Sequence, residues 1–287
     1  NFMDFYSQKP DNQPFFFWYG ATEPHRAYEE GSGLKSGKKL SDALVPDFLP
    51  SDSVVMSDIL DYYLEIEYFD SHLMKIIEFL KEKGELENTI IVVTADNGMS
   101  FPASKANLME YGTHVPLAIS WPEKITGGRV SDDMVATIDL APTFLEVAGI
   151  RNPVKMTGRS LSKILFSSVS GISDPFRKYV LTGRERHSHA RVDNVGFPAR
   201  AIRTQAYLYI LNLKPDRWPA GDPVRPDRGA CGSGGQERAR PCGGTQLRDR
   251  AQERLPGQRA ERGEGLPRGV PGLLRHREPA AGGRGRD

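Results

Sequence analysis

Residues 90–105, IIVVTADNGMSFPASK, join a strongly apolar run to a group of polar side chains. The run from Thr89 to Ala95 is rich in β-branched residues, which is typical of a buried strand. It leads directly into Asp96-Asn97-Gly98, and Lys105 follows Asp96 by nine residues. Asparagine followed by glycine favours a tight turn, which is the simplest interpretation. A carboxylate, a carboxamide and an ammonium group in this order also suit a site for a metal ion and an anion.

Two more apolar runs have the profile of buried strands. PFFFWYG at 14–20 is bounded by proline and glycine, and PLAISW at 116–121 has a similar composition. The first of these runs leads into a loop that carries His25. Residues 27–50 are polar and rich in glycine, lysine and proline, so we expect a long surface excursion there.

Two segments have the apolar periodicity of helices. From Ser51 to Gly84, apolar side chains recur at spacings of three and four, which predicts a long amphipathic helix. Ser51 or Ser53 is expected to cap its start, and Gly84 to end it. TIDLAPTFLEVAGI at 137–150 predicts a second helix, with a proline in its first turn and Gly149 as its stop. Strands and helices in this order predict an α/β fold, a sheet with helices packed against it.

The residue pattern changes after Gly158. Beyond Gly158, KYVLTGRERHSHARV and ARAIRTQAYLYILNL are strand-like and separated by polar turns, which predicts a smaller antiparallel subdomain. We therefore predict an α/β domain over residues 1–158, a partial subdomain over 159–223 and a tail over 224–287.

The tail differs sharply in charge from the rest. Residues 1–223 contain 24 Lys and Arg against 29 Asp and Glu, whereas residues 224–287 contain 14 Arg, no Lys and 8 acidic residues. The tail lacks Phe, Tyr, Trp, Ile and Met, so we expect it to be disordered. An arginine-rich tail that binds nucleic acid phosphates is one interpretation. Out-of-frame translation from about Pro223 is the favoured one, because all 13 lysines precede that point.

The cysteines and the apolar runs exclude some classes of protein. Cys231 and Cys242 both lie in the tail, so residues 1–223 hold neither a thiol nucleophile nor a cysteine-ligated metal. No apolar run approaches the length that spans a membrane.

Polar groups follow two of the predicted strands. In open α/β sheets, ligand sites lie beyond the carboxyl ends of the strands, which is where His25, Asp96 and Asn97 fall. The carboxylate and amide oxygens of the last two suit Ca²⁺ or Mg²⁺ better than zinc. Individually, the residues have ordinary explanations: turn residues, a surface lysine at 105 and a loop histidine. Together they suit the binding of a tetrahedral oxyanion and the protonation of a leaving oxygen.

Residues 91–123, IVVTADNGMSFPASKANLMEYGTHVPLAISWPE, resemble the second signature region of the sulfatase family, within the alkaline-phosphatase-like superfamily. IDLAPTFLEVAGI and GRSL resemble later landmarks of the family, and the similarity runs from Pro14 to Pro223. PFFFWYGATEPHR and DNGMSFPASKANL are most similar to the heparan N-sulfatase-like (sulfamidase-like) branch. The resemblance implies an alkaline-phosphatase-like mixed sheet flanked by helices, with a smaller C-terminal antiparallel subdomain that is incomplete here.

The resemblance also implies roles for individual residues. Asp96 and Asn97 match calcium ligands of the family, and Lys105 stands where the family places a basic residue on the sulfate. His25 stands where the family places a histidine near the leaving-group oxygen. The implied reaction is the calcium-assisted hydrolysis of a sulfuric ester or sulfamate on a sulfated sugar, such as a glycosaminoglycan.

Some family features are expected to lie outside this chain. In the family, a formylglycine made from Cys or Ser in a C/S-x-P-x-R motif is the nucleophile, and paired aspartates complete the calcium site. We expect both before Asn1, and we expect the family's last strand and helix to be replaced by the tail. The parent protein is thus expected to be a sulfatase, and this chain by itself to be inactive.

Glu185, His187 and His189 are candidates for contacts with sugar hydroxyls or sulfates, or else are exposed loop residues.

A phosphodiesterase or phosphatase of the superfamily and a binding module without a nucleophile are the alternative functions. The expected partner is a sulfated carbohydrate, with neither nucleic acid nor membrane, and the expected location is periplasmic or secreted, or lysosomal in a eukaryote.

Overall fold

A computed structural model describes residues 1–151, 154–187 and 192–217, and these form two compact units. Unit 1 contains Asn1–Thr89 together with Ser100–Pro102. Unit 2 contains Ile90–Met99 and the described residues from Ala103 onward. The tail at 224–287 and its cysteines lie outside the described residues. The domain boundaries inferred from the sequence stay a prediction.

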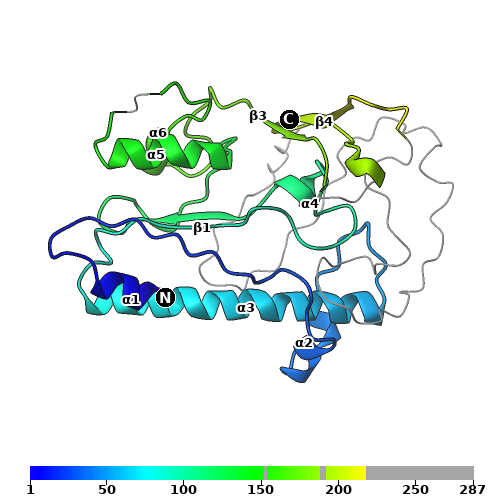
Figure 1. Ribbon diagram of the computed structural model, residues 1–287, viewed down its shortest axis with the longest axis horizontal. Coiled ribbons are helices and arrows are strands. Elements are labelled where there is room, and N and C mark those ends of the chain that lie inside the picture. Colours follow the sequence, from blue (N-terminus) through cyan, green and yellow to red (C-terminus); the bar gives the residue numbers. More distant parts are fainter. Residues whose placement is uncertain (152–153, 188–191, 218–287) are drawn as a thin grey trace, which may run out of the picture. The chain divides into compact units, whose positions relative to one another are not determined.

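The 30-residue helix α3, Ser53–Glu82, forms the centre of unit 1 (Figure 1). Its N-cap is Asp52, whose carboxylate accepts hydrogen bonds from the backbone N–H groups of Val54 and Val55, both at 3.0 Å. The predicted caps Ser51 and Ser53 flank this residue, so the helix was predicted correctly and its cap was wrong. Gly84 has φ +71°, the left-handed conformation that ends a helix, as predicted.

The excursion between residues 27 and 50 is pinned to this helix. It contains the short helix α2, Ser32–Lys35, and the 3-10 turn η1, Leu40–Asp42. Asp61 of α3 is only 3% exposed, and its carboxylate accepts hydrogen bonds from the backbone N–H groups of Gly31 at 2.9 Å and Gly33 at 2.7 Å. The fit requires glycine, because a Cβ on Gly33 would lie 2.4 Å from the carbonyl carbon of Leu60.

An aromatic cluster joins the first residues of unit 1 to α3. Helix α1, Phe2–Ser7, is capped by Asn1 and lies against α3 (Figure 1). The buried ring of Phe2 meets the ring of Phe17 at a centroid distance of 5.0 Å and that of Phe79 at 5.8 Å. Such edge-on contacts bury large apolar surfaces.

The predicted strand at 14–20 is wrong. Among the described residues these form an extended segment that belongs to neither sheet. Their side chains do alternate, because Phe15 and Phe17 pack in the aromatic cluster whereas Phe16 and Trp18 are 68% and 78% exposed. The sequence pattern therefore indicated an extended conformation, but ladder pairing needs a neighbouring strand.

Unit 2 begins with the strand that the opening stretch predicted. Strand β1, Ile91–Thr94, pairs antiparallel with β2, Leu117–Ser120, and Ile91 faces Ser120. Both strands fall within the predicted runs, and helix α4, Glu110–Thr113, lies between them in the chain. The 3-10 turn η2, Thr137–Asp139, leads into α5, Leu140–Val147, which confirms the second predicted helix.

A three-stranded antiparallel sheet completes unit 2, as predicted for the smaller C-terminal part of an α/β protein. Its order is β3-β4-β5, with bounds Tyr179–Arg184, Ala199–Thr204 and Leu208–Asn212. The 3-10 turn η3, Val192–Asn194, lies between β3 and β4 in the chain. Ala199 and Ala201 of the central strand are buried against Leu108, with Leu208 packed beside them.

A second core in unit 2 forms around helix α6, Ser162–Leu165. Its buried residues are Leu161, Ile164 and Leu165. Beside it lies a buried ion pair in which Nη1 of Arg177 is 2.7 Å from Oδ2 of Asp139. The two side chains are 2% and 8% exposed, so polar groups as well as apolar ones hold this part together.

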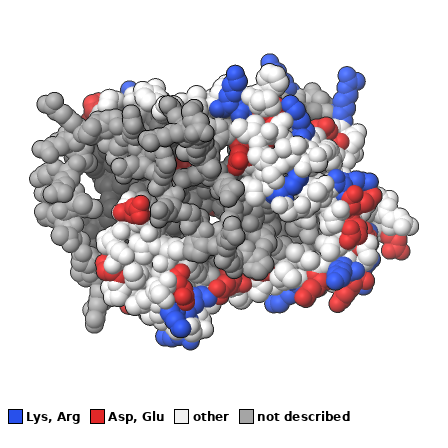
Figure 2. Space-filling model, turned by 180° about the vertical axis from the view of Figure 1, so that it is seen from behind, with Lys and Arg blue, Asp and Glu red and all other residues white. Residues whose placement is uncertain are grey.

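The surface carries charges of both signs. On the face drawn in Figure 2, acidic and basic side chains of the described residues lie next to one another. Within the described residues, no helix is both long and apolar enough to cross a membrane.

Candidate functional site

The candidate metal ligands directly follow β1. Asp96 is exposed, and Asn97 is partly buried. Nδ2 of Asn97 donates a hydrogen bond to the carbonyl oxygen of Gly98 at 2.8 Å. Because the nitrogen end of the amide is used in this way, its oxygen is the end left for a cation. The structure thus places one carboxylate and one amide oxygen at the end of a strand.

The turn after these residues is closed by glycine contacts. The N–H of Gly98 donates to the carbonyl oxygen of Gly112 at 3.1 Å, and the N–H of Lys105 donates to that of Met99 at 3.0 Å. A Cβ on Gly98 would lie 1.7 Å from the carbonyl oxygen of Tyr111. The chain bends at residues 96–98, and the close backbone approach at Gly98 holds the segment that carries Asp96 and Asn97.

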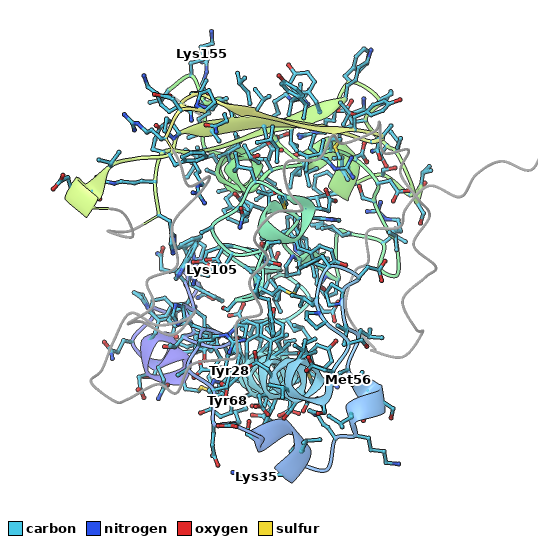
Figure 3. All side chains as sticks on the ribbon, turned by 90° about the vertical axis from the view of Figure 1, so that its right-hand side faces the viewer. Tyr28, Lys35, Met56, Tyr68, Lys105 and Lys155 are labelled. Atoms are coloured by element: carbon cyan, nitrogen blue, oxygen red, sulfur yellow. The ribbon has the colours of Figure 1, made fainter. Side chains whose placement is uncertain are left out.

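Lys105 lies at the end of this loop and is labelled in Figure 3. Its side chain is partly buried, and no residue that the structure describes forms an ion pair with its ammonium group. The neighbouring Ser104 is completely buried, which anchors the loop beside it. An ammonium group without a carboxylate partner suits an anionic ligand.

The donor chemistry of this loop fits a hard cation, but the number of donors does not complete a site. Calcium takes six to eight oxygen ligands, of which Asp96 and Asn97 supply a part. No group of three or more His, Cys, Asp or Glu that suits a metal ion occurs among residues 1–151, 154–187 and 192–217.

His25 belongs to unit 1, whereas Asp96, Asn97 and Lys105 share one loop of unit 2. Each group is therefore described within its own unit. The His25 side chain is exposed, and its Nδ1 contacts the carbonyl oxygen of Arg26. A carbonyl oxygen only accepts, so Nδ1 carries the proton. In the neutral ring, Nε2 is then the nitrogen that can accept a proton.

The sequence missed the contacts of Arg26, the residue next to His25. Its guanidinium forms a two-pronged ion pair with Asp58 of α3, with Nη1 at 2.8 Å from Oδ1. Its Nε donates to the carbonyl oxygen of Ser100 at 3.0 Å. Adjacent arginine and histidine residues are too common to signal such a contact.

The predicted substrate residues are only partly described. Glu185 is exposed and pairs with Arg200 of β4. His187 is exposed as well, and His189 lies outside the described residues. Their roles stay a prediction.

A second polar cluster that the sequence missed joins α4 to β4. Glu110 lies 3.0 Å from Nδ1 of His114 and 2.8 Å from Nε of Arg203. The His114 hydrogen bond, followed by the Arg203 guanidinium, lowers the pKa of Glu110 to about 2, although partial burial opposes the shift. The carboxylate therefore stays charged in acid.

This cluster predicts a pH-dependent loss of stability. The folded pKa of Glu110 lies below its ordinary value of 4.5, so its stabilisation is complete above pH 4.5 and is lost as the pH falls through about 2. Glu110 is 41% exposed. Because solvent screens such pairs, we expect Glu110→Gln to cost only about 1 kcal/mol at pH 7.

Urea unfolding at pH 7, 4 and 2.5 measures this effect. The difference between the wild type and Glu110→Gln should shrink at the acidic end, whereas the exposed control Glu87→Gln should show a small difference at every pH. A Glu110→Gln difference that grows in acid would contradict the assignment.

The nucleophile motif is expected before Asn1, yet its short pattern also occurs among the described residues. Residues 173–177 read SDPFR, which satisfies S-x-P-x-R within this chain. Arg177 of this run is 5% exposed and is bonded to Asp139. Oγ of Ser173 has a long hydrogen bond of 3.5 Å to the carbonyl oxygen of Val169. The contacts of this run are those of a packed structural segment, so the short pattern does not by itself identify a nucleophile.

Comparison with known proteins places these observations in a family. The model of the sulfatase family matches residues 1–150, and that of the C-terminal region of N-sulphoglucosamine sulphohydrolase matches residues 104–218. Human N-sulphoglucosamine sulphohydrolase is 26% identical over 237 residues, which cover 72% of this chain and 45% of that protein. An ulvan-active sulfatase of Formosa agariphila is 25% identical over 199 residues, 69% of this chain and 31% of its own.

Two further matches cover shorter parts of the chain. Human N-acetylglucosamine-6-sulfatase is 38% identical over 123 residues, 40% of this chain and 22% of that protein. A solved structure of a protein in complex with its substrate D-glucosamine-2-N,6-O-disulfate covers 57% of this chain and 37% of its own, at 25% identity and a TM-score of 0.47.

This chain spans less than half the length of these curated relatives. The family model nevertheless covers more than half of its 287 residues, including β1, the Asp96-Asn97 turn and Lys105. The chain belongs to the sulfatase family.

Proposed function

We propose that the protein to which this chain belongs hydrolyses sulfuric esters or sulfamates of a sulfated sugar. The observation that carries the proposal is the loop of Asp96, Asn97 and Lys105 after β1, in a chain of the sulfatase family. Oxygen donors and an ammonium group that has no ion-pair partner among the described residues, all on one short loop, suit a cation and a sulfate. The names of the relatives include both N-sulfated and 6-O-sulfated glucosamine, so the proposal covers both linkages.

Each residue has one role in this proposal. Asp96 and Asn97 hold part of a Ca²⁺ site with their oxygens, and Lys105 neutralises charge on the sulfate. When bound, Ca²⁺ supplies further positive charge for the sulfate oxygens. His25 in its doubly protonated form gives a proton from Nε2 to the leaving oxygen or nitrogen and becomes neutral, while its Nδ1 proton stays on the carbonyl of Arg26.

None of the described residues is assigned as the nucleophile in this proposal. A formylglycine from a C/S-x-P-x-R motif outside this chain stays a prediction, as does a periplasmic or secreted location. The phosphodiesterase alternative needs further Asp and His ligands for two metal ions. It is not favoured, because the relatives named above are sulfatases.

Calcium titration of the full 287-residue chain tests the metal assignment without any need for turnover. We expect weak binding, with a Kd on the order of 10⁻⁴ to 10⁻³ M, because only part of the ligand set is supplied. Asp96→Ala should abolish this binding. Isothermal titration calorimetry measures both.

Asp47→Ala is the matched control, since Asp47 is also an exposed aspartate. Its binding should equal that of the wild type. Tight binding that survives Asp96→Ala would overturn the metal assignment, and equal losses in both variants would show that only diffuse charge attracts the ion.

A further inference from the structure

The guanidinium of Arg26 lies where three segments of unit 1 meet. It is paired with Asp58 of α3 and donates to the carbonyl oxygen of Ser100. Its carbon lies 4.8 Å from the ring centre of Tyr28 and 4.9 Å from that of Phe101. The Arg26 side chain is 18% exposed, and Tyr28 lies beside α3 (Figure 3). One side chain thus holds the 22–28 loop, the long helix and residues 100–102 together.

The surroundings of Arg26 leave it little freedom. The hydroxyl of Tyr28 donates to the carbonyl oxygen of Pro24 at 3.1 Å, so its ring is fixed on the same loop. Burial raises the pKa of Tyr28 to about 12, and the ring stays neutral beside the cation. Phe101 is buried and packs edge-on against Tyr62 of α3, at a centroid distance of 5.7 Å.

The backbone of Arg26 in turn orients His25. Nδ1 of His25 donates to the carbonyl oxygen of Arg26, which fixes the imidazole as the Nδ1–H tautomer. An imidazole without such a partner exchanges between its two tautomers and rotates about its side-chain bonds. The position of that carbonyl depends on the anchored side chain of the same residue.

We propose that Arg26 is the positioning residue for His25: it fixes the carbonyl that holds Nδ1–H, so Nε2 is the atom that takes up a proton and then gives it to the leaving group. The inference rests on the proposed function, because His25 acts as the acid only there. Arginine suits the task better than lysine. Its fork pairs with both oxygens of Asp58 while Nε bonds to a third group, and its flat face stacks on rings.

Nitrogen-15 NMR of the histidine rings at pH 8, where an ordinary histidine is neutral, tests this proposal. The full chain contains 6 histidines, and His25→Gln identifies the signals of His25. In the wild type, the two ring nitrogens should show the widely separated shifts of the Nδ1–H tautomer. In Arg26→Gln, the shifts should converge towards the average of two exchanging tautomers.

Two further variants separate the effect of the Arg26 hydrogen-bond geometry from the effect of its positive charge. Arg26→Lys keeps the positive charge but loses the fork and the Nε bond, and it should behave like Arg26→Gln. Lys35→Gln removes a cation of unit 1 that pairs with Glu29 at an exposed site, and it should leave the His25 shifts unchanged.

Circular dichroism of each variant measures its helix content and so shows whether the variant is folded. If Arg26→Gln keeps its helix content and the His25 tautomer stays fixed, the proposal is wrong. If Arg26→Gln unfolds, Asp58→Asn replaces it, because this change weakens the same pair and should cause a smaller convergence of the shifts. The readout needs no turnover, so its failure is distinct from a failure to find sulfatase activity.

Discussion

Asp139→Ala is expected to lower the free energy of unfolding by about 3–5 kcal/mol, the cost of removing one partner of a buried ion pair. The Asp139 side chain is 8% exposed and that of Arg177 is 2% exposed, so water does not replace the lost contact. Nη2 of Arg177 would keep its bonds to the carbonyl oxygens of Arg159 and Ser160, both at 2.8 Å. Nη1 would lose its carboxylate, and the buried guanidinium would keep only the longer contact between its Nε and Oδ2 of Asp174, at 3.5 Å.

The loss extends to the backbone that Asp139 organises. Its carboxylate also accepts from the N–H of Arg159 at 2.8 Å and from that of Ala136 at 3.1 Å. Alanine satisfies neither of these partly buried donors, which adds to the loss because an unsatisfied donor costs about 1–3 kcal/mol when it is buried.

Urea unfolding followed by Trp121 fluorescence measures the change within unit 2. Trp18→Phe and Trp218→Phe in every variant remove the other two tryptophans. The control is Lys124→Gln, which removes an ion pair to Glu123 at 2.7 Å whose lysine is 47% exposed. Such surface pairs contribute about 0–1 kcal/mol. Equal losses in Asp139→Ala and Lys124→Gln would show that the buried pair contributes no more to stability than an exposed one.

The parts of the fold that local sequence determines were predicted correctly. The period of apolar residues gave helix α3 over almost its full length, and glycine chemistry gave its end at Gly84. The start was off by one residue, because three consecutive residues at 51–53 all suit an N-cap and only the folded backbone chooses among them. Residues 14–20 were assigned to a strand because alternation reports extension but not pairing.

The candidate site also contains some residues that the sequence predicts and some contacts that it does not. Asp96, Asn97 and Lys105 lie close together in the chain, so one short pattern predicts them. Arg26 and Asp58 are 32 residues apart, and Glu110 and Arg203 are 93 apart. Contacts over such separations leave no local signal. The run SDPFR shows the converse, since a short pattern occurs in a segment whose contacts are structural.

Gly98→Ala is expected to displace the loop of the candidate site and to cost about 3 kcal/mol or more, at the upper end of what overpacking costs. The reason is space, because an added Cβ would lie 1.7 Å from the carbonyl oxygen of Tyr111 and 2.7 Å from its carbonyl carbon. Both are backbone atoms and do not swing away as a flexible side chain does. The hydrogen bond from the N–H of Gly98 to the carbonyl oxygen of Gly112 would break when these two backbone segments separate.

Gly112 makes the displacement hard to absorb. A Cβ there would lie 2.4 Å from the carbonyl oxygen of Ser104 and 2.5 Å from that of Asn107, so the backbone is closely packed on that side too. The loop therefore moves at its other end, which carries Asp96 and Asn97. Gly98→Ala should accordingly lose both stability and the weak calcium binding expected of the wild type.

Gly127→Ala is the matched control for this change. No atom lies within 4 Å of a Cβ at Gly127, so alanine is expected there to change stability by less than about 1 kcal/mol, and in the stabilising direction. Urea unfolding and calcium titration of both variants provide the measurement. If Gly98→Ala matches Gly127→Ala in stability, the close approach to Tyr111 is not maintained in solution. If it is destabilised yet binds calcium as the wild type does, the ion is held by residues other than Asp96 and Asn97, because these two cannot keep their positions once Gly98 moves.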